Sequence, residues 1–133
     1  MNFIRKTIQC ISSYCKTPKV YTPDDLVNAC KNGDAILTKN ILDTTDFGID
    51  VHSKALFEAV CSGYPEPGKL IIQDNEVSNL DECLKEACIR SKYAVAEMLV
   101  EMGARTIVGL RVAKSPNIIR MLYRYEQNSE NIN

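Results

Sequence analysis

The chain has 133 residues, of which 45% are hydrophobic and 25% charged, and this composition fits one globular domain. Its formal net charge of −1 provides no broad basic field, so binding to a nucleic-acid backbone is not expected. The sequence contains no run of about 18 apolar residues, so a membrane span is not expected either.

Residues 1–20 are predicted to form a short helix and a linker. Pro18 ends a helical pattern of apolar residues that consists of Phe3, Ile4, Ile8 and Ile11. We expect this segment to cap the domain or to be a flexible tail. Contact with a membrane through a basic amphipathic helix is the alternative.

An L-x-x-A pattern recurs four times within residues 21–125. It begins at Leu26, Leu56, Leu84 and Leu110. A repeat with a period of 20–50 residues is typical of a solenoid, in which each unit buries its apolar face against the next. We therefore expect one repeat domain over residues 21–125.

The first unit contains clear signals for two helices. Thr22 and Pro23 suit the start of a helix that runs through Cys30, and Gly33 suits its end. Asp34 is expected to cap a second helix, which is followed by a loop over residues 43–50.

The second unit repeats this order with differences. Ser53 is expected to cap a helix that ends at Gly63. Pro65 and Pro67 indicate a stiff turn over residues 64–68, so the second helix should be shortened to residues 69–73.

The last two units complete the array. A helix is expected to begin at Asn79 or Asp81, with Ser91 at the turn position and a second helix over residues 93–102. The fourth unit should contain helices over residues 108–114 and 117–125, and its Thr106–Val108 run is the best but weak β-like signal. Residues 126–133 are polar and aperiodic, which indicates a flexible tail.

The spacing inside the units resembles the ankyrin repeat. Twelve and thirteen residues after Ala29, Ala59 and Ala87 stand the apolar pairs Ile41–Leu42, Ile71–Ile72 and Leu99–Val100, and Gly103–Ala104 closes the third unit. The Thr-Pro-Leu-His start is out of register and the turn histidine is absent, so the array is divergent. The composition resembles ankyrin proteins of large DNA viruses, which implies a viral host-interaction factor. Another all-α solenoid of helical hairpins is the alternative fold.

Catalytic and metal sites are not indicated. His52, the only histidine, stands just before Ser53, and a catalytic pair would need it beside a nucleophile, but an exposed turn residue at a helix start is the expected role. Cys83 and Cys88 are spaced as a zinc pair could be, but five residues along a helix separate their directions by about 140°. We therefore predict no enzyme activity, metal, cofactor or small-molecule substrate.

The cysteines indicate the compartment. No secretory signal is evident, and Cys30, Cys61 and Cys88 lie in or beside the repeated helices. They are interpreted as reduced packing residues, which implies a cytoplasmic location.

The resemblance implies a protein-binding module, either an adaptor or an inhibitor, that binds through loop tips and the exposed side of each first helix. On this chain the implied positions are Asp25, Asn28, Asn32, Phe47, Asp50, Glu58, Ser62, Asn75, Glu76, Glu86, Arg90 and Arg105. Self-association into a homo-oligomer or larger assembly is the alternative, since solenoid ends expose apolar faces unless they are capped.

Overall fold

The computed structural model describes residues 20–132, and this part of the chain contains eight helices and no strand. The predicted all-α class is therefore confirmed. The helix predicted within residues 1–20 lies outside the described residues, as do Cys10 and Cys15.

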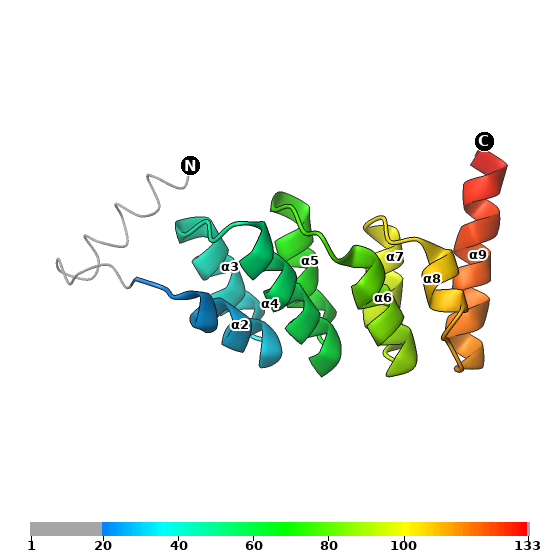
Figure 1. Ribbon diagram of the computed structural model, residues 1–133, viewed down its shortest axis with the longest axis horizontal. Coiled ribbons are helices and arrows are strands. Elements are labelled where there is room, and N and C mark those ends of the chain that lie inside the picture. The colour runs from blue at the N-terminus through cyan, green and yellow to red at the C-terminus, as the bar shows by residue number, and fades with distance from the viewer. Residues whose placement is uncertain (1–19, 133) are drawn as a thin grey trace.

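The helices form four successive pairs: α2 (Pro23–Lys31) with α3 (Ala35–Thr44), α4 (Ile49–Ser62) with α5 (Pro65–Asp74), α6 (Leu80–Ile89) with α7 (Tyr93–Glu101), and α8 (Thr106–Leu110) with α9 (Pro116–Ile132). The first helices contact one another in the order α2, α4, α6, α8, and the second helices in the order α3, α5, α7, α9. Figure 1 shows the resulting elongated array, with α2 and α9 at opposite ends.

Local signals fix several helix ends as predicted. Thr22 and Asp25 form a reciprocal capping box at α2, in which each side chain accepts a hydrogen bond from the backbone N–H of the other residue. Asp34 caps α3 by accepting a hydrogen bond from the Leu37 N–H at 3.0 Å. Gly33 and Ser91 both have positive φ, at 73° and 57°, so the serine replaces the turn glycine as expected.

The start of α4 differs from the prediction. The helix begins at Ile49, so the prediction that Ser53 caps it is wrong. Gly48, with φ of 93°, turns the chain into the helix, and its N–H donates to the Asp46 carboxylate at 3.0 Å. His52 and Ser53 are consequently buried helical residues.

Helix α5 is also longer than predicted, because both prolines are part of it. Pro65 and Pro67 occupy its first turn, where backbone N–H groups have no partner within the helix and proline costs little. Gly68 follows in the next turn, and a Cβ there would lie 3.0 Å from Met98 Cε and 3.1 Å from Leu56 Cδ1. Pro67 and Gly68 of the predicted stiff turn are therefore buried helical residues, whereas Glu66 is exposed.

The fourth pair departs most from the repeat. Helix α8 covers Thr106–Leu110 instead of 108–114, so the weak β-like run is helical and Ala113 lies beyond the helix. Gly109 is the buried residue of α8. Helix α9 runs to Ile132, through residues expected to be an aperiodic tail. Side chains near its middle bind neighbouring elements, since Tyr125 donates to Glu101 at 2.9 Å and Thr106 donates to Glu126.

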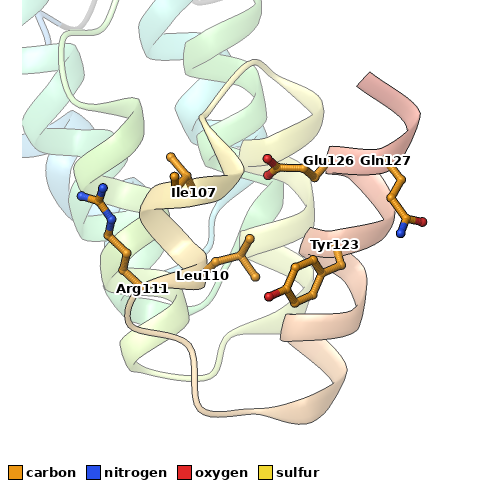
Figure 2. Close-up of a pocket in the computed structure, with 6 residues that line it drawn as sticks. All are labelled: Ile107, Leu110, Arg111, Tyr123, Glu126 and Gln127. Carbon is orange, nitrogen blue, oxygen red and sulfur yellow. The ribbon is translucent and has the colours of Figure 1, made fainter. Parts of the chain in front are cut away.

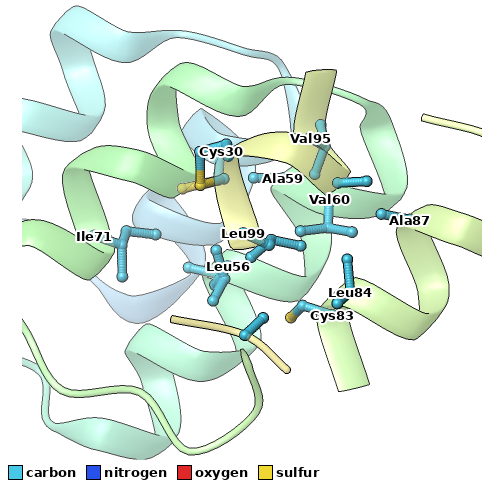
Figure 3. Close-up of a cluster of buried hydrophobic side chains, with 14 of the residues drawn as sticks. Cys30, Leu56, Ala59, Val60, Ile71, Cys83, Leu84, Ala87, Val95 and Leu99 are labelled. Carbon is cyan, nitrogen blue, oxygen red and sulfur yellow. The ribbon is translucent and has the colours of Figure 1, made fainter. Parts of the chain in front are cut away.

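One apolar core runs through the array. The first-helix leucines Leu26, Leu56 and Leu84 and the second-helix residues Ile41, Ile71 and Leu99 have no exposed surface. Figure 3 shows part of this cluster, in which side chains of α4, α5, α6 and α7 meet. Each such side chain contributes about 1.5–3 kcal/mol by leaving water, so burial between successive pairs holds the helices together.

Candidate interaction surfaces

Equivalent positions of successive first helices carry polar side chains. Each first helix contains a buried alanine, which is Ala29, Ala59 or Ala87. The residue just before this alanine is Asn28, Glu58 or Glu86. The residue three positions after it is Asn32, Ser62 or Arg90. Because α4 contacts both α2 and α6, these six predicted residues form two rows across the first helices. All six are exposed or half-buried. We call them the first-helix surface.

The charged part of the first-helix surface gathers beside Cys61. Burial raises the pKa of the Cys61 thiol, Arg90 lowers it, and Glu86 and Glu58 raise it, so all three charges act on the same sulfur. Arg90 Nε donates to Glu86 Oε1 at 2.8 Å, and this hydrogen bond raises the pKa of Arg90. The ion pair neutralises Glu86. Glu58, the other carboxylate of the first-helix surface, has no ion-pair partner among the described side chains.

Asp25 has a structural role that sequence reasoning did not separate from binding. Its carboxylate accepts the Thr22 N–H at 2.9 Å within the capping box. It also stands one helical turn before Asn28, at a position that holds Ala55 in the second unit. Asp25 is therefore not part of the two rows, and a change there would alter the stability of α2 as well as any surface.

The predicted loop residues differ in how available they are. Asp50 and Glu76 are exposed, although Asp50 belongs to the first turn of α4. Phe47 is half-buried and packs against the core. Asn75 ends α5, and its side-chain amide donates to the Ile71 carbonyl at 3.1 Å. Phe47 and Asn75 thus hold the loops in place, and of these loop residues Asp50 and Glu76 are the exposed ones.

Arg105, which precedes α8, contacts the first turn of α6. Its N–H donates to Asp81 Oδ1 at 3.0 Å, and its Nε donates to Asp81 Oδ2 at 2.8 Å. The hydrogen bond from the Arg105 backbone is the main cause that lowers the pKa of Asp81. The side-chain hydrogen bond and the guanidinium charge lower it further, and partial burial acts against this shift. Arg105 remains largely exposed, but a partner would have to compete with Asp81 for it.

His52 is the clearest error among the residues considered for chemistry. It was expected at an exposed turn, but it is a buried residue of α4, only 2% exposed, because the helix begins at Ile49. Among the described residues, neither its Nε2 nor the buried Asn79 Oδ1 has a hydrogen-bond partner. Burial lowers the pKa of His52, and the Asp46 charge opposes this shift.

Ser53 connects its helix to the next loop. The Ser53 hydroxyl accepts the Ser78 N–H at 2.9 Å, and the Asn79 side chain donates to the Ser53 carbonyl at 2.9 Å. This explains why a serine is buried at that position: its hydroxyl satisfies the Ser78 N–H in the loop that leads into α6. The interpretation of Ser53 as a helix cap missed this role, because no local pattern indicates a partner 25 residues away.

The cysteines of the described residues are all free. Burial raises the pKa of the Cys30 and Cys88 thiols to about 11 and that of Cys83 to about 12, which suppresses the reactive thiolate. Within residues 20–132 no group of three or more His, Cys, Asp or Glu side chains could hold a metal ion. In the same part of the chain, no helix is long and apolar enough to cross a membrane.

The α8–α9 end of the array carries an apolar groove that the sequence did not single out. Figure 2 shows Leu110 and Tyr123 facing one another, and Ile107, Arg111, Glu126 and Gln127 also line the groove. The groove has a volume of about 540 Å³, and Ile107 and Tyr123 are 48% and 55% exposed. We call it the end groove.

Comparisons with known proteins give no further indication. No family model matches the chain. No curated protein matches it, and no solved structure matches it.

Proposed function

We propose that this protein is a non-enzymatic protein-binding module, an adaptor or inhibitor built as a short ankyrin-like solenoid. The observation that carries the proposal is the first-helix surface, where polar residues occupy equivalent positions of α2, α4 and α6. A repeated helix pair that presents equivalent positions side by side offers an extended surface of the kind that solenoid proteins use for binding.

The charge of the first-helix surface suggests the chemistry of the proposed partner. Glu58 lies between Asn28 and Glu86, and Arg90 offsets Glu86. The proposed partner therefore presents a basic group opposite Glu58, with polar groups around it. Such complementarity raises the association rate and favours the correct partner. A viral host-interaction role is part of the same hypothesis and depends on the partner.

Affinity capture from cells in which the protein occurs, followed by mass spectrometry, identifies candidates. The deciding comparison uses Glu58→Lys/Glu86→Lys against a matched control, Glu66→Lys/Glu97→Lys, which makes the same change in net charge on the second helices. Asp25 is left unchanged because it caps α2.

The first variant should lose the captured partner by about tenfold or more in affinity, which corresponds to about 1.4 kcal/mol, while the control retains it. Equal binding by both variants would show that the first-helix surface is not the interface. Thermal unfolding of both variants checks that neither result reflects loss of the fold.

Self-association is a second candidate, and the end groove favours it. Ile107 and Tyr123 expose apolar surface at the end of an array whose other helix pairs bury the corresponding faces. Light scattering over a concentration series tests this candidate, with Tyr123→Gln expected to reduce the mass of any oligomer. A monomer at all concentrations would eliminate it.

A further inference from the structure

Charge changes sign along the array. Residues 20–101 carry fifteen Asp and Glu side chains against seven Lys and Arg, whereas residues 102–125 contain no acidic residue. The same C-terminal segment carries five basic residues, namely Arg105, Arg111, Lys114, Arg120 and Arg124. The nearly neutral total therefore conceals a basic segment over residues 102–125, which follows an acidic body and precedes Glu126 and Glu130 of α9.

Two of these arginines share one hollow. It has a volume of about 320 Å³ and is lined by Tyr93 of α7 and by Asn117, Arg120 and Arg124 of α9. Residues four apart on a helix project from the same face, so the two guanidinium groups are neighbours. Arg120 Nη2 donates to Asn117 Oδ1 at 2.6 Å, which orients one guanidinium. Tyr93 adds a partly exposed ring to the wall.

Neither arginine is neutralised within the described part of the protein. Arg90 and Arg105 form ion pairs with Glu86 and Asp81, but Arg120 and Arg124 have no ion-pair partner among the described side chains. The α7 carboxylate Glu101 instead accepts the hydroxyl of Tyr125. The hollow therefore retains two exposed positive charges and most of their hydrogen-bond donors.

We propose that this hollow binds the phosphate group of a phosphorylated peptide side chain. A phosphate monoester carries nearly two negative charges at neutral pH and three acceptor oxygens, which match two guanidinium groups. Clusters of arginine are a recurrent means of recognising phosphorylated motifs. Tyr93 can pack against the peptide beside the phosphate, because its ring lines the same hollow.

The charge distribution favours a compact anion on a peptide over a nucleic acid. A long polyanion would approach the fifteen acidic side chains of residues 20–101, which repel it, whereas a single phosphate in the hollow experiences mainly the basic residues of the 102–125 segment. This site lies on second helices, apart from the first-helix surface, so it does not depend on the proposed function above.

An array of short peptides of varied sequence tests the proposal. Each peptide carries a central serine, threonine or tyrosine and is made with and without phosphate. The protein should bind a subset of phosphorylated peptides about tenfold or more tightly than their unphosphorylated forms, since charged hydrogen bonds are the stronger kind. Fluorescence polarisation then gives the affinity of the best pair.

Two double variants make the assignment to this hollow. Arg120→Gln/Arg124→Gln should reduce phosphopeptide affinity by about tenfold or more, whereas Arg111→Gln/Lys114→Gln, which removes two charges of the same segment outside the hollow, should change it less than about threefold. Arg120→Lys/Arg124→Lys keeps the charge, so a partial recovery would separate loss of recognition from loss of folding.

Four results would overturn the proposal. The first is no preference for any phosphorylated peptide, and the second is an equal loss of affinity in both glutamine double variants. The third is an affinity for inorganic phosphate equal to that for the best peptide, and the fourth is tighter binding of a single-stranded oligonucleotide through Arg120 and Arg124. The third result would assign the hollow to free phosphate, and the fourth to a nucleic acid.

Discussion

Gly109 provides the sharpest test of how the last helix pair packs. It is buried in α8, and a Cβ at this position would lie 2.9 Å from Cys88 Sγ, 3.0 Å from Leu122 Cδ1 and 3.3 Å from Leu84 Cγ. These atoms come from α6 on one side and α9 on the other. The absence of a side chain at Gly109 is therefore what allows α8 to lie close to both helices.

Gly109→Ala has two opposing effects. Replacing glycine by alanine inside a helix stabilises it by up to about 1 kcal/mol, whereas forcing extra atoms into a packed core costs about 1–3 kcal/mol. The two shortest contacts are with packed side chains of α6 and α9, so we expect a net loss of about 1–2 kcal/mol in the free energy of unfolding. With a urea m value of about 2 kcal/mol/M, the midpoint should fall by about 0.5–1 M.

A double-mutant cycle with Cys88→Ala isolates the closest contact. Removing the sulfur that lies 2.9 Å from the new Cβ should make Gly109→Ala less costly, with a favourable coupling of at least about 0.5 kcal/mol. Urea unfolding of the wild type, both single variants and the double variant gives this value. A more stable Gly109→Ala protein, or strictly additive variants, would refute the close packing of α8 on α6.

Three further predictions concern other parts of the array. Gly33→Ala should destabilise the protein more than Gly48→Ala, because both residues have positive φ but only at Gly33 would the new Cβ meet the Tyr64 ring, at 2.7 Å. The difference should be about 1–3 kcal/mol by urea unfolding, and equal losses would contradict it. Burial lowers the pKa of His52, so the unfolded chain binds a proton that the folded chain does not, and stability should decrease as the pH falls below about 6.5. Urea midpoints at pH 5 and 7.5 measure this effect, and His52→Gln should show a smaller difference between the two. Half-buried Cys61 should react with a thiol reagent before the three buried cysteines of the described residues, and mass mapping of labelled peptides measures the order. Simultaneous labelling would argue against the packing of the buried thiols.

Much of the helical order could be predicted because its causes are local. The capping box at Thr22, the Asp34 cap and the positive φ of Gly33 each involve residues within about one turn, so the sequence pattern contains both partners. The apolar pairs that follow the alanines by 12 and 13 residues are likewise visible, and Ile41, Ile71 and Leu99 are indeed fully buried.

The candidate surface was predicted less completely. The first-helix rows follow from the repeat, since equivalent positions of successive units must lie side by side. Phe47 and Asn75 were assigned to partner contact, but they pack or hydrogen-bond within the chain. Exposure alone cannot be read from polarity, because a loop side chain can satisfy a backbone group as readily as it can face a partner.

The sequence by itself determined the helical units, the caps of α2 and α3 and many of the core residues, because periodicity and capping act over a few residues. Only the tertiary structure decided that His52 and Ser53 are buried, because their burial depends on packing within the array and the Ser53 bond to Ser78 joins residues 25 positions apart. It also decided that Gly109, and not Ala113, is the buried small residue of the last pair. The hollow that contains Arg120 and Arg124 needs α7 beside α9, a juxtaposition that neither helix encodes alone.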